Sequence, residues 1–326
     1  MKKFGAFFGK CILVALPFIL VIGYTFLFPF GYMDNEYPDR AYTKDVIKGS
    51  DSYETIILGD SRAVADIIVN EFDESAVTLA NGGATAIENY YYLKDYIKKH
   101  GAPKRCIVGL APFHYTQIDN FWYRTVYFND LTIGEMNEVM RNARAIPDIK
   151  TDGFLYGWDT ADLISNRLRL PHVYMPALVN SHFIGRYSDN KAIYDSVSAE
   201  KGHHLYGMDD GCSDFNYEVN FEKMRETPDA ELAKNYLLML LNLCRDNDIE
   251  TYVVAFPMNK SSYDNLQESY KESLYMFLRS LSDLYPEMVV ENEIIYYEDE
   301  MFGDASHLNQ KGAEIFTEEF KSKYNL

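Results

Sequence analysis

The chain has few cysteines, and none of them stands in a metal-binding spacing. Of its 326 residues only four are cysteine, and neither Cys-x-x-Cys nor His-Glu-x-x-His occurs. Because structural zinc sites are usually built from closely spaced cysteines and histidines, we expect no metal ion, and nothing else in the sequence calls for a cofactor. Cys106 lies in an apolar run and is expected to be buried. Cys212 and Cys244 either pair or stay free.

Basic residues are also scarce. The chain carries 49 acidic and 31 basic residues, and beyond residue 30 its net charge is −21. Proteins that bind nucleic acids or anionic membrane surfaces present basic patches, and this sequence has no basic stripe. The composition therefore argues against nucleic acid as a partner. Internal repeats and low-complexity tracts are absent as well.

Charge is missing altogether from one stretch near the N-terminus. Cys11 to Phe30 form an uncharged run of 20 residues, which as a helix rising ~1.5 Å per residue would cross ~30 Å of hydrocarbon. Three lysines precede it and no acidic residue occurs before Asp34, so the positive-inside rule places the short tail in the cytoplasm and the rest outside. We expect residues 1–31 to be an uncleaved single-pass anchor in the cell membrane. A cleaved signal peptide is the alternative.

The rest of the chain alternates between strand and helix patterns. Short aliphatic and β-branched runs predict five strands, at 55–59, 76–80, 105–110, 251–256 and 288–291. Amphipathic stretches between and after them predict helices at 62–72, 85–100, 230–247, 263–285 and 310–324. This alternation predicts an α/β fold with a parallel sheet and right-handed crossovers.

Two segments interrupt the alternation. Residues 32–52 are expected to form an extended juxtamembrane segment between the anchor and the domain. Residues 115–229 are rich in Tyr, Asp and Asn, and such a long segment inside a compact domain is usually an inserted lid or binding element. We therefore expect one α/β domain over 53–326 with an insertion at about 115–229. Phe121-Trp122-Tyr123 within it suits stacking on sugar rings.

Two short motifs at opposite ends of the domain carry residues suited to catalysis. Gly59-Asp60-Ser61 closes the first predicted strand, which places Ser61 at the carboxyl edge where open α/β sheets bind ligands. Asp304 and His307 stand three residues apart after the last strand. Serine, histidine and a carboxylate are the nucleophile, base and orienting group of serine hydrolases and acyltransferases. The structural alternatives are a helix cap for Ser61 and an ordinary surface histidine for His307.

These motifs resemble those of the SGNH (GDSL-type) hydrolase superfamily. Gly59-Asp60-Ser61 is similar to its first sequence block, and Asp304-Ala305-Ser306-His307 with the run that follows is similar to its last. The resemblance implies a three-layer α/β/α fold with a flavodoxin-like parallel sheet. It also implies Ser61 as nucleophile, His307 as general base and Asp304 as the residue that holds the histidine ring. It covers the core elements of the domain and leaves out the insertion.

The other two family blocks are less complete. The second supplies a glycine whose backbone N–H helps to form the oxyanion hole, and either Gly82 or Gly83 in Ala80-Asn81-Gly82-Gly83-Ala84 would serve. The third block, usually Gly-x-Asn-Asp, is missing, and the corresponding strand runs into Pro112-Phe113-His114. His114 either replaces the missing oxyanion donor or packs beneath the insertion.

Three further polar positions need an assignment. Arg62 either meets a carboxylate or phosphate on the substrate or forms an ion pair with Asp60 or Asp66, and we expect the ion pair. Asp60 is expected to cap the turn rather than to take part in catalysis. His203-His204 is expected to be a surface pair without metal-ligand partners.

The missing third block and the N-terminal anchor point to a divergent, membrane-anchored branch of the superfamily. That branch includes teichoic-acid D-alanylation and alginate O-acetylation proteins. The resemblance implies O-acyl transfer to, or ester hydrolysis on, an envelope polysaccharide or acylated glycan outside the membrane, with a membrane-bound O-acyltransferase as a candidate partner. The alternative is a non-catalytic carbohydrate-binding or assembly subunit that retains the fold.

Overall fold

Five parallel strands form the central sheet. They are β1 (Thr55–Gly59), β2 (Ala76–Thr78), β3 (Arg105–Gly109), β4 (Glu250–Val254) and β6 (Val289–Val290), in the order β2-β1-β3-β4-β6. The expected α/β fold with a parallel sheet is therefore confirmed, although some strands end a residue or two early. The strand order reverses direction between β1 and β3, and the carboxyl ends of these two strands flank the point where open α/β sheets bind ligands.

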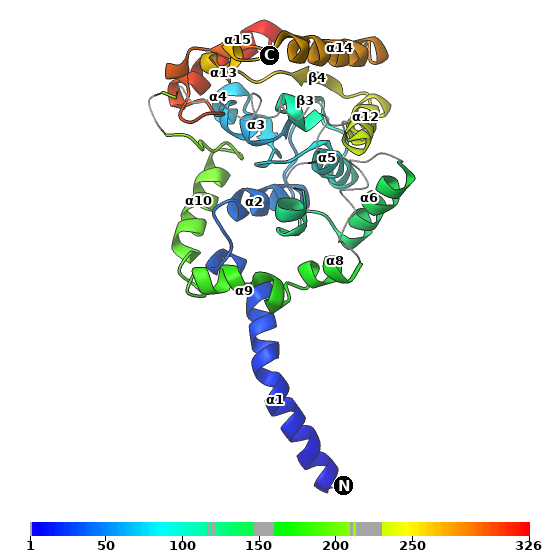
Figure 1. Ribbon diagram of the computed structural model, residues 1–326, viewed down its shortest axis with the longest axis vertical. Helices are drawn as coiled ribbons and strands as arrows, with labels where there is room; N and C mark the ends of the chain where they lie inside the picture. The colour runs from blue at the N-terminus through cyan, green and yellow to red at the C-terminus, as the bar shows by residue number, and fades with distance from the viewer. Residues whose placement is uncertain (1, 116–117, 119–120, 147–159, 209–210, 213–229) are drawn as a thin grey trace.

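The computed structural model describes residues 2–115, 118, 121–146, 160–208, 211–212 and 230–326. In Figure 1 the domain stands at the end of one long helix, α1 (Lys2–Leu27), and the C-terminus lies far from that helix.

Alternate strand residues face two separate apolar cores, so helices cover both faces of the sheet. Ile56 and Val108 point into a core shared with α5 (Ala86–His100), α12 (Glu231–Asp246) and α14 (Glu268–Leu284). Ile57 and Ile107 point into a second core shared with α3 (Ser61–Ala65), α4 (Val69–Phe72) and α15 (Gln310–Tyr324). Full burial of each large aliphatic side chain contributes ~1.5–3 kcal/mol, which explains why continuous aliphatic runs form the strands.

Helix α1 is long and apolar enough to span a membrane over Gly9–Leu27. Its 19 residues there measure ~28 Å at ~1.5 Å per residue. Side chains in its middle are exposed, Leu13 at 69% and Val14 at 70%. The last turn differs, because Thr25 is fully buried and its hydroxyl donates to the Arg169 carbonyl at 2.8 Å. The helix therefore enters the domain without a linker.

Residues 32–52 are not extended, so that prediction was wrong. After a 3-10 turn η1 (Pro29–Gly31), helix α2 (Tyr37–Lys48) packs inside the domain and buries Arg40 and Tyr42. Pro38 lies in the first turn of α2, where a missing N–H costs no intrahelical hydrogen bond.

The helix expected at 62–72 is divided into α3 and α4. Tertiary hydrogen bonds hold the break: Asp66 accepts from the Leu308 N–H at 3.1 Å, and the Ile68 N–H donates to Thr317 Oγ1 at 3.0 Å. The helix expected at 263–285 is likewise divided, into α13 (Lys260–Asp264) and α14. The helical periodicity of a sequence does not reveal hydrogen bonds to distant segments, so it could not predict these breaks.

The described part of the insertion is largely helical. After η2 (Pro112–Tyr115), which leads into it, its described elements are the π-helix η3 (Trp122–Val126), α6 (Ile133–Ala145), α8 (Thr160–Arg167), α9 (Pro171–Asn180) and α10 (Tyr187–Ala199). Figure 1 shows α8, α9 and α10 on the side of the domain from which α1 leaves. Parts of the predicted insertion, 116–117, 119–120, 147–159, 209–210 and 213–229, lie outside the described residues. A small parallel sheet of β5 (Met258–Asn259) and β7 (Tyr296–Tyr297) was not expected.

All four cysteines are free. Cys212 and Cys244 therefore do not pair. Cys106 is buried, as expected, and a hydrogen bond with its neighbour Cys244, together with burial, raises the pKa of its thiol.

Candidate active site

The structure brings Ser61, His307 and Asp304 together at the carboxyl edge of the sheet. Ser61 begins α3 directly after β1, and its Oγ lies 2.7 Å from His307 Nε2. The two residues are 246 positions apart in the sequence. The other ring nitrogen, His307 Nδ1, lies 3.0 and 2.9 Å from the two carboxylate oxygens of Asp304. A hydroxyl, an imidazole and a carboxylate thus stand in the order that activates a serine nucleophile.

Asp304 also shapes the loop that carries His307. Its Oδ1 accepts hydrogen bonds from the backbone N–H groups of Ser306 and His307, both at 2.8 Å. Burial raises the pKa of Asp304, but the hydrogen bonds from the His307 ring and from these N–H groups outweigh it and hold the pKa below its usual value. The carboxylate is therefore ionised at neutral pH and can stabilise a protonated His307.

Asp60 holds the loops that follow β1 and β3. One carboxylate oxygen accepts from the Arg62 N–H at 3.0 Å and so caps α3, as expected. The other accepts from the Ala111 N–H and from His114 Nδ1, both at 2.6 Å. Burial raises the pKa of Asp60, but the bond and charge of His114 outweigh it and lower the pKa. His114 is itself buried, which favours the packed alternative over an oxyanion donor.

Arg62 is buried rather than aimed at solvent. Its residue surface is only 3% exposed. Together with His114, its positive charge lowers the pKa of Asp60 against the effect of burial. The structure favours the expected structural role of Arg62 over contact with a substrate anion.

Gly82 and Gly83 form a tight turn beside the end of β1. The Ala84 N–H donates to the Asn81 carbonyl at 3.0 Å, and the Asn81 N–H donates to the Gly59 carbonyl at 3.4 Å. Gly83 has a φ of +67° whereas Gly82 does not have positive φ. Within the described part of the chain, the N–H groups of Gly82 and Gly83 have no hydrogen-bond acceptor. Both are thus available to a ligand near Ser61.

Tyr206 links this turn to the histidine and was missed by the sequence analysis. Its ring centroid lies 5.0 Å from that of His307, and its hydroxyl would lie 3.5 Å from a Cβ on Gly82. The hydroxyl donates to Asp39 at 3.0 Å, and the ring stacks on His204 at 5.1 Å. No local pattern marks this tyrosine, because apart from His204 its partners come from three distant segments.

The prediction of a His203-His204 surface pair was wrong. His203 is buried, and its Nδ1 lies 2.9 Å from the Val64 carbonyl in α3. His204 is half-buried, with Nδ1 3.2 Å from Asp39 Oδ1. The His203 ring thus contacts a carbonyl of α3 and the His204 ring a carboxylate of α2, which the adjacent pair in sequence does not reveal.

Arg124, from η3, is a second residue that the sequence analysis missed. A Cβ on Gly83 would meet its side chain, with Arg124 Cδ at 3.0 Å. Arg124 also pairs with Glu36 at 3.0 Å and is partly exposed. It places a cation beside the turn, where a negatively charged group of a ligand would be favoured.

Among the described residues, no group of three or more His, Cys, Asp or Glu side chains could hold a metal ion. Comparison of the chain with protein families, with curated proteins and with solved structures gave no match. The assignment of function therefore depends on the motifs and on the geometry of this site.

Proposed function

We propose that the chain is a membrane-anchored serine enzyme of the SGNH type that transfers an acyl group to, or removes it from, a glycan. The observation that carries the proposal is the 2.7 Å contact between Ser61 Oγ and His307 Nε2, with Asp304 at the other ring nitrogen. The parallel sheet with helices on both faces is compatible with the three-layer arrangement of that superfamily.

In the proposed mechanism His307 takes the proton of Ser61 as Oγ attacks an ester carbonyl. The Ser61 N–H and an N–H of the Gly82-Gly83 turn stabilise the oxyanion that forms. His307 then returns the proton to the leaving alcohol, which leaves an acyl group on Ser61. A glycan hydroxyl or water, deprotonated by His307, attacks this acyl group, and His307 returns the proton to the Ser61 Oγ that leaves. Asp304 fixes the ring and stabilises its protonated form.

The proposed location is the outer face of the cell membrane. The three lysines before the apolar run of α1 favour a cytoplasmic N-terminus. The proposed substrate is an envelope polysaccharide or another acylated glycan, and the proposed partner is a membrane-bound O-acyltransferase that supplies acyl groups. The mechanism needs no metal ion and no cofactor.

The test uses the full chain in detergent micelles. We expect p-nitrophenyl acetate turnover and covalent labelling by a fluorophosphonate, both lost in Ser61→Ala, because both reactions need the activated hydroxyl. In cells, acyl content of the surface polymer should change in the Ser61→Ala strain. Poor turnover of the small ester with altered polymer acylation would favour transfer over hydrolysis. Unchanged polymer acylation in both Ser61→Ala and His307→Ala strains, at normal protein levels, would favour a non-catalytic glycan-binding or assembly subunit.

A further inference from the structure

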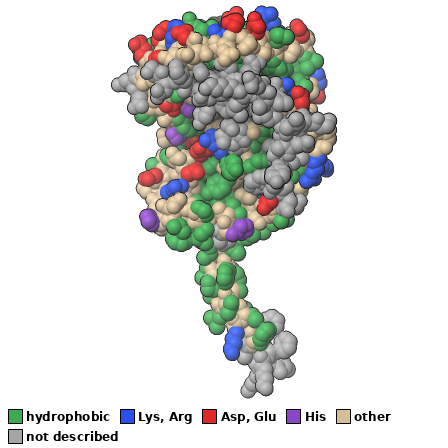
Figure 2. Space-filling view, viewed as in Figure 1, with side chains coloured by type: hydrophobic (Ala, Val, Ile, Leu, Met, Phe, Trp, Pro, Cys, Tyr) green, Lys and Arg blue, Asp and Glu red, His purple; other side chains and the backbone are tan. Residues whose placement is uncertain are grey.

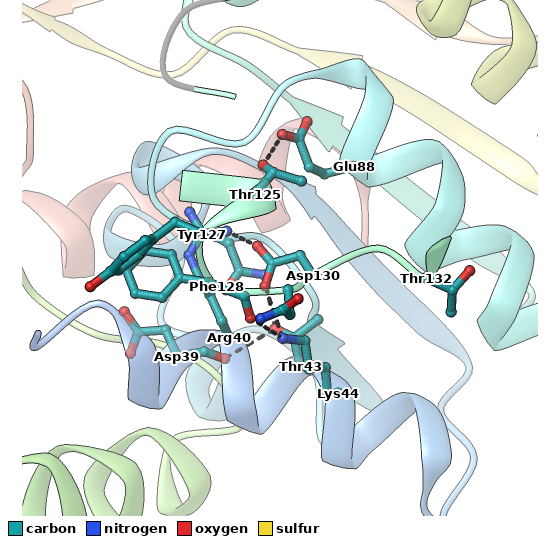
Figure 3. A network of polar contacts seen from close by, with 12 residues as sticks. Asp39, Arg40, Thr43, Lys44, Glu88, Thr125, Tyr127, Phe128, Asp130 and Thr132 are labelled. Carbon is teal, nitrogen blue, oxygen red and sulfur yellow. Dashed lines mark hydrogen bonds and ion pairs between the residues drawn. The ribbon is translucent and has the colours of Figure 1, made fainter. Parts of the chain in front are cut away.

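A buried arginine from helix α2 reaches the turn beside Ser61. Arg40 Nη2 donates to the Gly82 carbonyl at 2.7 Å, and the residue is 1% exposed. Its Nη1 pairs with Asp130, and the Phe128 ring lies 4.8 Å from the guanidinium carbon (Figure 3). Lys44 Nζ lies 3.0 Å from the other oxygen of Asp130. Charge pairing and packing thus fix the guanidinium in one place.

The carbonyl that Arg40 binds belongs to the central peptide of a type II turn. A positive φ at Gly83 but not at Gly82, closed by the bond from Ala84 to Asn81, defines that turn type. Type I and type II turns differ by a flip of this peptide, and glycines permit both. Arg40 can donate its hydrogen bond only when the peptide is oriented with the Gly82 oxygen toward the guanidinium.

The orientation of the carbonyl also sets the direction of the next N–H. In a planar trans peptide the C=O and N–H point in opposite directions, so the Gly83 N–H points away from Arg40. That N–H has no acceptor among the described residues. Donation from Arg40 to the carbonyl also polarises the peptide and strengthens its N–H as a donor.

We propose that Arg40 is a positioning residue that fixes the Gly82–Gly83 peptide so that the Gly83 N–H is the second oxyanion donor. This inference rests on the proposed function and resolves which of the two glycines serves. Stability alone does not account for the buried charge of Arg40, because an apolar side chain of similar volume often stabilises a fold as well as a buried ion pair does. The positioning role gives the charge a reason. Helix α2, which follows the membrane helix in the chain, would thus complete the oxyanion site.

The test compares Arg40→Lys and Arg40→Gln with Lys44→Met in the full chain. Lysine keeps a charge for Asp130 but lacks the fork that reaches both Asp130 and Gly82. We expect kcat for p-nitrophenyl acetate and the rate of fluorophosphonate labelling to fall about 100- to 1000-fold, the range for loss of one oxyanion donor, with KM nearly unchanged. Lys44→Met removes a cation from the same carboxylate without touching Gly82, so its kcat should stay near that of the wild type. Rates are expressed per molecule that elutes as a folded monodisperse peak.

The outcomes separate this inference from the proposed function. Wild-type kcat in folded Arg40→Lys or Arg40→Gln, with an active parent, overturns the positioning role and leaves the enzyme intact. An equal loss in Lys44→Met overturns it too, because the effect would then follow from disturbance of Asp130. A wild-type chain without Ser61-dependent activity overturns the proposed function and this inference with it.

A second, independent observation concerns the end of the domain from which α1 leaves. Helix α9 is mostly apolar, with His172 and Asn180 as its polar residues, and from Pro171 to Gly185 the chain has no Asp, Glu, Lys or Arg. Tyr174 and Leu178 pack in the domain, while Val179 is 54% and Ile184 62% exposed. Figure 2 shows hydrophobic side chains gathered around the point where α1 emerges. Apolar side chains gathered on an exposed surface are normally covered by protein or by lipid.

The last turn of α1 is bound directly to this surface. Besides the bond from Thr25 to Arg169, the Tyr24 hydroxyl donates to the Phe183 carbonyl, and the Arg186 N–H donates to the Gly31 carbonyl at 3.2 Å. These contacts fix α9 and residues 181–184 beside the end of the apolar helix. We infer that this surface lies in the lipid interface of the bilayer that α1 spans. The domain would then rest on the membrane with a fixed orientation.

Bimane attached at single cysteines of the full chain in lipid nanodiscs tests this inference. Cys11→Ser and Cys212→Ser remove the accessible thiols, and Val179→Cys or Ile184→Cys carries the label. We expect quenching by brominated phosphatidylcholine, as for a Leu16→Cys control within α1. Met276→Cys, an equally apolar and 72% exposed site on α14, should be quenched by aqueous iodide only. Quenching of Val179→Cys and Ile184→Cys by iodide alone would overturn the inference, because the surface would then face water. Quenching by neither agent would also overturn it, because protein would then cover the surface. Absence of lipid quenching at Leu16→Cys would overturn the anchor itself.

Discussion

Asp66 Oδ1 accepts a hydrogen bond from the Leu308 N–H at 3.1 Å. Asp66 ends the short helix that Ser61 begins, and Leu308 directly follows His307, so this bond joins the two halves of the site. Asp66 is fully buried, and its Oδ2 has no hydrogen-bond partner among the described residues. Burial raises the pKa of Asp66 well above its usual value, and the charges of Asp60 and Asp304 add to the rise.

This raised pKa predicts a pH dependence of stability. Because the folded pKa lies above the unfolded value of about 3.9, Asp66 contributes stability that is fully present below that value and is lost as pH rises through the folded pKa. Asp66→Asn keeps the acceptor for Leu308 but cannot ionise. We expect the free energy of unfolding of the wild type to fall relative to Asp66→Asn as pH rises from about 4 to 9, measured by denaturant unfolding of the full chain in detergent. Parallel pH curves for the two proteins would contradict the prediction.

The three residues of the site should act as one unit. Ser61→Ala removes the nucleophile and His307→Ala removes its base, so each alone should lower kcat by about 10³- to 10⁶-fold, and the double variant should be hardly worse. Asp304→Asn should cost somewhat less than either. Thermal unfolding should change little, since Asp60 rather than Ser61 caps α3 and the Ser61 hydroxyl makes one hydrogen bond, worth ~0.5–1.5 kcal/mol, to His307. Additive losses in the double variant would argue that the two side chains act in separate steps.

Arg62 should matter for stability rather than for binding. Arg62 is buried, and its charge, together with His114, favours the ionised form of the buried Asp60, so its removal typically costs about 3 kcal/mol or more. We expect Arg62→Met to lower the free energy of unfolding by about that amount and to leave KM of the folded fraction unchanged. Arg62→Lys, which keeps the charge, should recover part of the loss. A large rise in KM at unchanged stability would instead assign Arg62 to an anionic substrate group.

The sequence predicts the strands and the triad well because both depend on local pattern. The aliphatic run of β1 has to be buried, and its carboxyl end has to meet the loops of other parallel strands, so Ser61 and His307 converge once the sheet forms. The resemblance supplies the roles that are proposed for them. The prediction of an extended segment at 32–52 failed because the structure there depends on distant contacts: Arg40 and Lys44 of α2 pair with Asp130 in the insertion.

The remaining site residues could not be found from local pattern. Arg40 and Tyr206 are single polar residues in segments without a motif, and their partners lie at Gly82, Asp130 and His307. Only the folded chain brings these segments together. The turn at Gly82 and Gly83 shows the same limit: two adjacent glycines indicate a turn, but the choice of peptide orientation depends on a side chain some forty residues away.

Tyr206 offers a test of how the ring of His307 is supported. The tyrosine ring packs on His307 at 5.0 Å, while its hydroxyl donates to Asp39 at 3.0 Å, away from the reacting atoms. Burial and the Asp39 carboxylate raise the pKa of Tyr206 well above its usual value, so the hydroxyl stays protonated across the working pH range.

Tyr206→Phe keeps the ring, and we expect its kcat to remain within about threefold of the wild type, since the packing contact is retained. Tyr206→Ala leaves His307 free to tilt, and small misplacements of a catalytic group cost up to about 100-fold in rate. Stopped-flow acylation by p-nitrophenyl acetate measures both variants. Equal losses in the two would mean that the hydroxyl and its bond to Asp39, rather than the ring, support His307.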